Sequence, residues 1–157
     1  MAAGNLVVEQ VDATAPEAVE LMAALDLELS ARYPGDQIRG IDAGNFRAAG
    51  GVFLIGRREG LAVACGALRP FSGSMKDRAV ELKRMYVRDG HRGQGFARTI
   101  LNALEEIAKQ RGYETVRLET GDQQPEAISL YESAGYRSIP CEGMDSDERS
   151  RCFEKIL

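Results

Sequence analysis

Glu81-Leu-Lys-Arg-Met-Tyr-Val-Arg88, a short polar turn, and Arg92-Gly-Gln-Gly-Phe-Ala97 form the stretch that decides the fold. The β-branched and aromatic residues of the first part predict a strand. From Phe96 onward apolar side chains recur at helical spacing, which predicts a helix that ends at Gly112. In such an arrangement the unpaired N–H groups and the positive dipole end of the helix face an anion. The order of strand, glycine turn and helix therefore predicts a binding site for a phosphorylated ligand.

The composition of this turn suits a diphosphate. Gly93 and Gly95 carry no side chain that would keep a ligand from the backbone, and Arg92 adds a forked, permanently charged donor. A dinucleotide-binding fingerprint would need a small residue where Arg98 stands, and the Gly-Lys-Ser/Thr of a Walker loop is absent. The alternative is a solvated turn in which the arginine and the glycines bind no ligand.

Composition indicates one domain, over residues 1–157, and excludes several classes of protein. The chain has no apolar segment long enough to cross a bilayer and no recognisable signal peptide, so we expect a cytoplasmic protein without a membrane partner. Three cysteines with no metal-ligand spacing indicate a reduced setting and no metal site.

The formal net charge of −4 argues against general affinity for nucleic acid. Cationic residues nevertheless gather in the central stretch, at Lys83, Arg84, Arg88, Arg92 and Arg98. Such a series is usually a solvated face, so only Arg92 is assigned a function.

The rest of the pattern predicts an α/β fold with a mixed, mostly antiparallel central sheet and flanking helices. We expect helices over residues 17–31, 43–48 and from Pro125 to Gly135, and a flap over a cleft within residues 36–51. The predicted strands cover residues 6–11, 52–58, 61–71, 78–88, 115–120, 136–139 and 150–157, with a turn at residues 72–77 and an acidic loop formed by Glu142, Asp145, Asp147 and Glu148.

Two segments resemble the signatures of the GNAT superfamily of CoA-dependent N-acetyltransferases. They are Arg92-x-x-Gly95-x-Ala97 and the segment Gln124-Pro-Glu-Ala-Ile-Ser-Leu-Tyr131, which continues to Gly135-Tyr136. The resemblance implies that the strands ending at Val87 and Thr120 splay apart and that acetyl-CoA is the co-substrate. The residues that it implies for cofactor binding are Met85, Tyr86 and Val87 along the pantetheine arm, Arg92, Gly93, Gln94, Gly95, Phe96 and Ala97 around the diphosphate, and Thr120 and Gln124 opposite. The family often has asparagine where Gln124 stands, and glutamine keeps the amide group on a side chain of longer reach.

The resemblance also implies transfer of an acetyl group to a primary amine, of a small molecule or a peptide, by direct attack in a ternary complex. Glu81 is the candidate base that removes the amine proton, and its alternative role is an ion pair at a strand edge. Tyr131 is the candidate acid toward the departing sulfur, and its alternative role is core packing. Cys65 lies on an expected buried strand without a histidine to activate it, so no acyl-enzyme is expected.

The sequence leaves other functions possible. A non-catalytic acyl-CoA-binding sensor or interaction module would use the same turn, and so, less well, would a nucleotide-phosphate site without CoA. Phe71, Arg32 and Tyr33 are candidates for the acceptor side. The sequence leaves a homodimer open.

Overall fold

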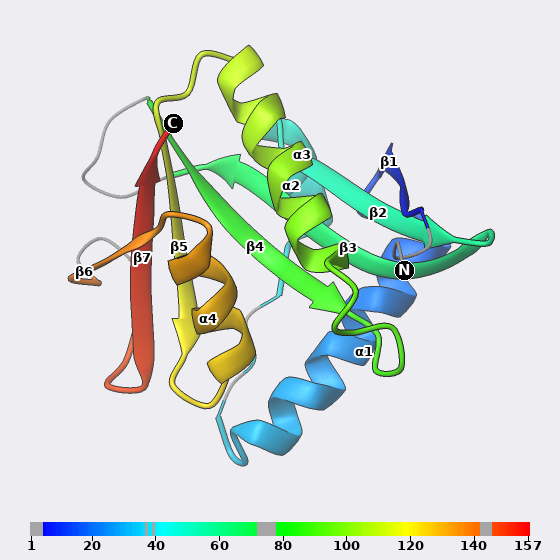
Figure 1. Cartoon of the computed structure of the whole chain (residues 1–157), viewed down its shortest axis with the longest axis horizontal. Helices are drawn as coiled ribbons and strands as arrows, with labels where there is room; N and C mark the ends of the chain where they lie inside the picture. Colours follow the sequence, from blue (N-terminus) through cyan, green and yellow to red (C-terminus); the bar gives the residue numbers. More distant parts are fainter. Residues whose placement is uncertain (1–4, 37, 39, 72–77, 142–145) are drawn as a thin grey trace.

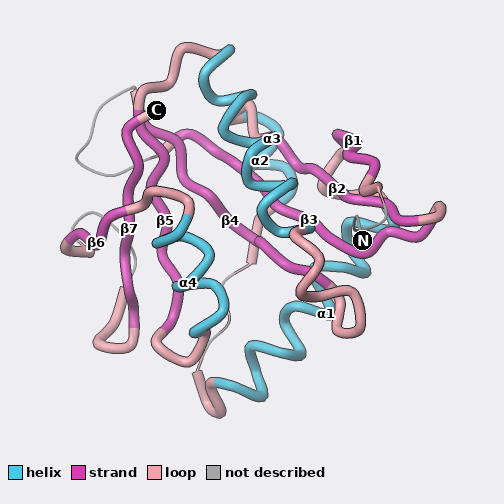
Figure 2. The backbone as a smooth tube through the Cα atoms, in the orientation of Figure 1, coloured by secondary structure: helices cyan, strands magenta, loops and turns pink. Residues whose placement is uncertain are grey.

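The structure is a computed structural model that describes residues 5–36, 38, 40–71, 78–141 and 146–157. These residues form eleven elements (Figures 1 and 2), in this order: β1 (Val7–Val11), α1 (Pro16–Arg32), α2 (Ala43–Ala48), β2 (Val52–Arg58), β3 (Leu61–Pro70), β4 (Ala79–Val87), α3 (Phe96–Gln110), β5 (Thr115–Gly121), α4 (Pro125–Ser133), β6 (Arg137–Ile139) and β7 (Ser150–Ile156). The predicted turn at residues 72–77, and Glu142 and Asp145 of the predicted acidic loop, lie outside the described residues.

The strands form one sheet in the order β1-β2-β3-β4-β5-β7-β6. All neighbours are antiparallel except β4 and β5, which are parallel and are joined through α3. The predicted mixed, mostly antiparallel sheet is therefore confirmed. Glu59 and Gly60 connect β2 to β3 with φ angles of 51° and 82°, as a two-residue hairpin turn requires.

Helices cover both faces of the sheet. The apolar stripe of α3, which includes Ile100, Leu101 and Leu104, packs on one face together with Tyr131 of α4. Leu21 of α1 and Phe46 of α2 belong to a second core on the opposite face. Figure 1 shows α3 and α4 in front of the sheet and α1 behind it. No helix in the described part of the chain is long and apolar enough to span a membrane.

The parallel pair separates halfway along its length. Residues from Ala79 to Leu82 pair with residues from Thr115 to Leu118, but the remainders of β4 and β5 do not pair with each other. Figure 1 shows the two strands diverging toward their carboxyl ends. The predicted splay is confirmed, and it leaves backbone groups on the facing edges without a sheet partner.

A β-bulge in β4 accompanies the splay. Arg84 has a φ of 59°, and the pairing with β3 shifts register between Cys65 and Ala67. A side chain at Gly66 would have its Cβ 2.5 Å from the sulfur of Met85, so this glycine makes room for the methionine. The bulge puts Arg84 on the same face as Lys83, which is the face covered by α1, where Arg84 reaches that helix. Met85 lies on the face covered by α3.

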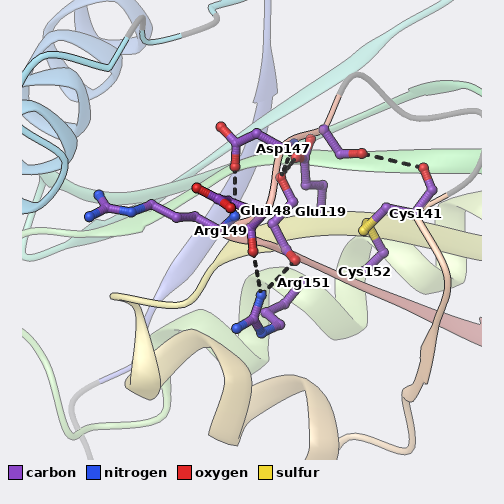
Figure 3. The surroundings of a disulfide bond; sticks show 9 residues. Glu119, Cys141, Asp147, Glu148, Arg149, Arg151 and Cys152 are labelled. Atoms are coloured by element: carbon purple, nitrogen blue, oxygen red, sulfur yellow. Dashed lines mark hydrogen bonds between the residues drawn. A yellow bond between two sulfur atoms is a disulfide. The ribbon is translucent and has the colours of Figure 1, made fainter.

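The expectation of reduced cysteines is wrong for one pair. Cys141 and Cys152 form a disulfide, with their Cα atoms 5.3 Å apart (Figure 3). The cause is the antiparallel pairing of β6 with β7, which sets Ile139 opposite Cys152 and so brings Cys141 beside it. The odd number of cysteines in the sequence did not indicate that two of them pair. Cys65 is free and buried, as predicted, and burial raises the pKa of its thiol to about 12.

Candidate active site

A cavity of about 810 Å³ opens where β4 and β5 diverge. Its volume is within the range of roughly 300–1,000 Å³ that small-molecule sites occupy. The cavity brings together five of the predicted site residues, namely Glu81, Met85, Thr120, Gln124 and Tyr131. Tyr33, Gly35 and Phe71 also line it, as do Asp36, Ile38 and Gly40 of the segment that was predicted to cover a cleft.

The glycine turn lies at the start of α3, next to the carboxyl end of β4. Gly93 and Gly95 have φ angles of 77° and 81°, and a Cβ on either would have no heavy atom within 4 Å. Gly95 is the N-cap of α3, and no side chain caps the helix. An anion can bind to the N–H groups at a helix N-terminus when the space above them is open. Gln94 accepts a hydrogen bond from Arg58, and Phe96 anchors the turn in the core.

Arg92 is held in place beside this turn. Its Nε donates to the Val87 carbonyl over 2.8 Å, and an Nη atom donates to Glu28 of α1 over 2.6 Å. The guanidinium carbon lies 5.6 Å from the ring centroid of Tyr86. Three of the predicted cofactor residues, Tyr86, Val87 and Arg92, therefore form one contact group. Within it, the Val87 carbonyl is already occupied.

Glu81 forms the ion pair that its alternative role describes, and it also lines the cavity. Arg69 lies opposite it on β3 and donates from Nε to one carboxylate oxygen over 3.0 Å. The other oxygen accepts no hydrogen bond from the residues described. With 13% of its side chain exposed, Glu81 is sheltered but remains accessible from the cavity.

Tyr131 projects from α4 into the core and reaches the other side of the cavity. Its ring packs 5.7 Å from that of Tyr136 and 6.4 Å from that of Phe153, measured between centroids. Burial raises the pKa of Tyr131 above its usual value, because the phenolate would be desolvated. The hydroxyl therefore stays protonated well past neutral pH and can serve as a donor.

Sequence reasoning misjudged two members of the cationic series. Arg84 is buried rather than solvated, with 4% of its side chain exposed, and it pairs with Asp26 of α1 over 2.7 Å. Lys83 lines the cavity. Alternation along the strand could not reveal the placement of Arg84, because the bulge at Arg84 breaks the alternation.

The end of α1 is attached to the loop between β5 and α4. The Tyr33 hydroxyl accepts from the backbone N–H of Gln123 over 2.9 Å, and Arg32 forms an ion pair with Glu126. A Cβ at Gly121 would lie 1.8 Å from the Tyr33 hydroxyl oxygen, so only glycine allows this contact. Arg32, a candidate for the acceptor side, thus holds the wall of the cavity from outside.

The sequence profile described as "Acetyltransferase (GNAT) family" matches residues 18–136, which include both halves of this site. The chain belongs to the GNAT acetyltransferase family. It is accordingly an acyltransferase, and the predicted resemblance is confirmed. The match extends into α1, where the sequence alone offered no signature.

Comparison with individual proteins supports the assignment to this family. The "IAA acetyltransferase" of Azospirillum brasilense is 32% identical over 118 residues, which are 75% of each protein. A crystal structure of a candidate acyl-CoA N-acyltransferase from Klebsiella pneumoniae has a TM-score of 0.77 and 32% identity, with 97% of each chain covered. An acetyltransferase structure from Salmonella typhimurium with its cofactor acetyl-CoA has a TM-score of 0.67 and 19% identity, covering 98% of this chain and 95% of that one, and it supports the fold.

Proposed function

We propose that this GNAT enzyme transfers an acetyl group from acetyl-CoA to a primary amine, by direct attack in a ternary complex. The observations that carry the proposal are the splay of β4 from β5, where a cavity contains Glu81 and Tyr131, and the glycine turn that follows β4 at the N-terminus of α3. Residues 1–157 would form one N-acetyltransferase domain.

The glycine turn and the diverging edges of β4 and β5 suit the binding of CoA. The turn from Arg92 to Ala97 would hold the diphosphate, because its helix is uncapped and both glycines border open space. The facing edges of β4 and β5, at Met85 and Thr120, would border the pantetheine arm. Acetyl-CoA supplies the acetyl group as a thioester, which is activated toward amines. The structure of the Salmonella relative with acetyl-CoA supports this choice of co-substrate.

Glu81 would remove the proton from the acceptor amine. An alkylammonium has a pKa of ~10.4, so the neutral amine costs about 4–5 kcal/mol at pH 7 unless the site accepts its proton. Arg69 occupies one oxygen of the Glu81 carboxylate. The proton would therefore go to the second oxygen, directly or through one water.

Tyr131 would stabilise the thiolate that leaves. A thiol has a pKa of ~8.5, whereas burial holds the pKa of Tyr131 above its usual value of ~10. Full transfer of the phenolic proton to sulfur is therefore uphill. A hydrogen bond that strengthens as charge develops on sulfur is the role that this difference favours.

Release of free thiol tests the proposal directly. The purified chain, incubated with acetyl-CoA and a panel of amines that includes amino acids, alkylamines, diamines and peptides, should release CoA thiol with at least one amine, and mass spectrometry should find that amine acetylated. Tight binding of acetyl-CoA without thiol release in any mixture would contradict the proposal and favour a sensor.

A further inference from the structure

The cationic side chains that line the cavity differ in whether a nearby carboxylate pairs with them. Arg69 pairs with Glu81 at 3.0 Å, Arg84 with Asp26 at 2.7 Å, and Arg149 with Asp36 at 3.8 Å. The fourth is Lys83, which has no hydrogen bond or ion pair with any of the residues that the structure describes. It therefore contributes an ammonium that this part of the chain leaves without a direct counterion.

The more distant charges around Lys83 do not replace a partner. Glu81 and Glu119 favour its charged form, whereas Arg69 and Arg84 oppose it. The two carboxylates and the two guanidiniums thus act on this pKa in opposite directions. Burial is the largest influence and lowers the pKa of Lys83, because the ammonium loses hydration that no direct partner among the described residues restores. An anion entering the cavity would restore it.

Lys83 and Glu81 lie on the same face of β4. They are two residues apart on the part of the strand that precedes the bulge, with Ala67 and Arg69 as their register partners on β3. Alternate residues of a strand share a face, with their Cα atoms about 7 Å apart. An acceptor whose amine is at Glu81 thus has Lys83 within reach of a group a few bonds away.

We propose that Lys83 binds a carboxylate of the acceptor, so that the acceptor is an amine that also carries a carboxylate, as amino acids do. This inference rests on the proposed function, which places the amine at Glu81. The two side chains then receive the two charged ends of one zwitterion. Lys83 is a residue that determines specificity and takes no part in proton transfer.

Matched acceptors test the inference. The panel consists of α-, β- and γ-amino acids, each beside the amine of equal chain length that lacks the carboxylate. The wild-type enzyme should prefer the best amino acid over its partner by about 10- to 100-fold in kcat/KM, which is the range for a charge-assisted hydrogen bond. Lys83→Met should remove most of this preference through KM, and Lys83→Arg should restore part of it. Lys109→Met, at an exposed position near the end of α3, is the control and should keep the preference.

The outcomes separate the two proposals. If no amine causes thiol release, the proposed function itself fails. If amines without a carboxylate are acetylated as well as their partners, or if Lys83→Met keeps the wild-type preference, the function stands and the role of Lys83 is refuted. An acetyl group found on Lys83 after incubation with acetyl-CoA alone would also overturn the inference, because the resulting amide carries no charge to pair with a carboxylate.

Discussion

Gly95→Asp should weaken CoA binding more than it weakens the fold. Gly95 is the N-cap of α3, and its missing side chain leaves open space over the first turn of the helix. The proposed diphosphate occupies this space. An aspartate there would fill it with a carboxylate and repel the phosphates.

The magnitude follows from the charge. If the carboxylate comes to about 5 Å from a phosphate charge, repulsion is ~1 kcal/mol in water-like surroundings and ~3 kcal/mol at an effective dielectric constant of ~20. CoA affinity should fall roughly 5- to 150-fold. Backbone strain is a separate effect, because an L residue at a φ of 81° costs about 1–2 kcal/mol of stability.

Two controls separate charge from strain. Gly95→Asn has the size of the aspartate but no charge, so its CoA affinity should fall less. Gly112→Asp has nearly the same strain, with a φ of 84° and open space around its Cβ, but lies at the opposite end of α3. Titration calorimetry with CoA, beside thermal unfolding of each variant, measures both effects. Equal CoA affinity in Gly95→Asp and Gly95→Asn would refute the placement of the diphosphate.

Three further substitutions test the site and the fold. Tyr131→Phe should lower kcat on the order of 10²-fold at saturating acetyl-CoA with little change in CoA affinity. Because burial raises its pKa, Tyr131 should cause no alkaline decline in kcat below about pH 10, and a wild-type kcat in the variant would make the hydroxyl a bystander. Glu81→Gln should lose most activity at low pH and less as the amine deprotonates in solution, whereas a pH–rate profile parallel to wild type would leave Glu81 as the partner of Arg69 alone. Cys141→Ser should lower stability by about 2–3 kcal/mol and Tm by roughly 5–10 °C, and dithiothreitol should then lower the Tm of wild type but not of the variant.

Local pattern was sufficient to predict most of the elements. The helix at Ala43–Ala48 and the strand at Val52–Arg58 were predicted with the bounds observed, and α3 was predicted from its apolar spacing. These elements are set by residues close in sequence. The strand, glycine turn and helix that are proposed to hold the diphosphate could be predicted for the same reason, because they are contiguous in the sequence.

Contacts between distant residues could not be predicted. Glu105 looks like an exposed residue of α3, yet it is buried, where it accepts hydrogen bonds from Tyr136 and from Lys155, 50 residues away. Arg84, at the bulge, pairs with Asp26, 58 residues away. No spacing pattern in the sequence indicates any of these contacts. They become visible only once the sheet has brought the segments together.

The pairing of Arg92 with Glu28 shows how such a distant contact serves the site. A guanidinium has five N–H donors, and Arg92 uses one of them toward Val87 and another toward Glu28. Three remain, and in the proposed complex they would face phosphate oxygens. Glu28 therefore does not block the site. It fixes the guanidinium against β4, so that the proposed binding of phosphates would cost little side-chain entropy. α1 carries no recognisable motif, but it orients the arginine of the one motif that the sequence shows most clearly.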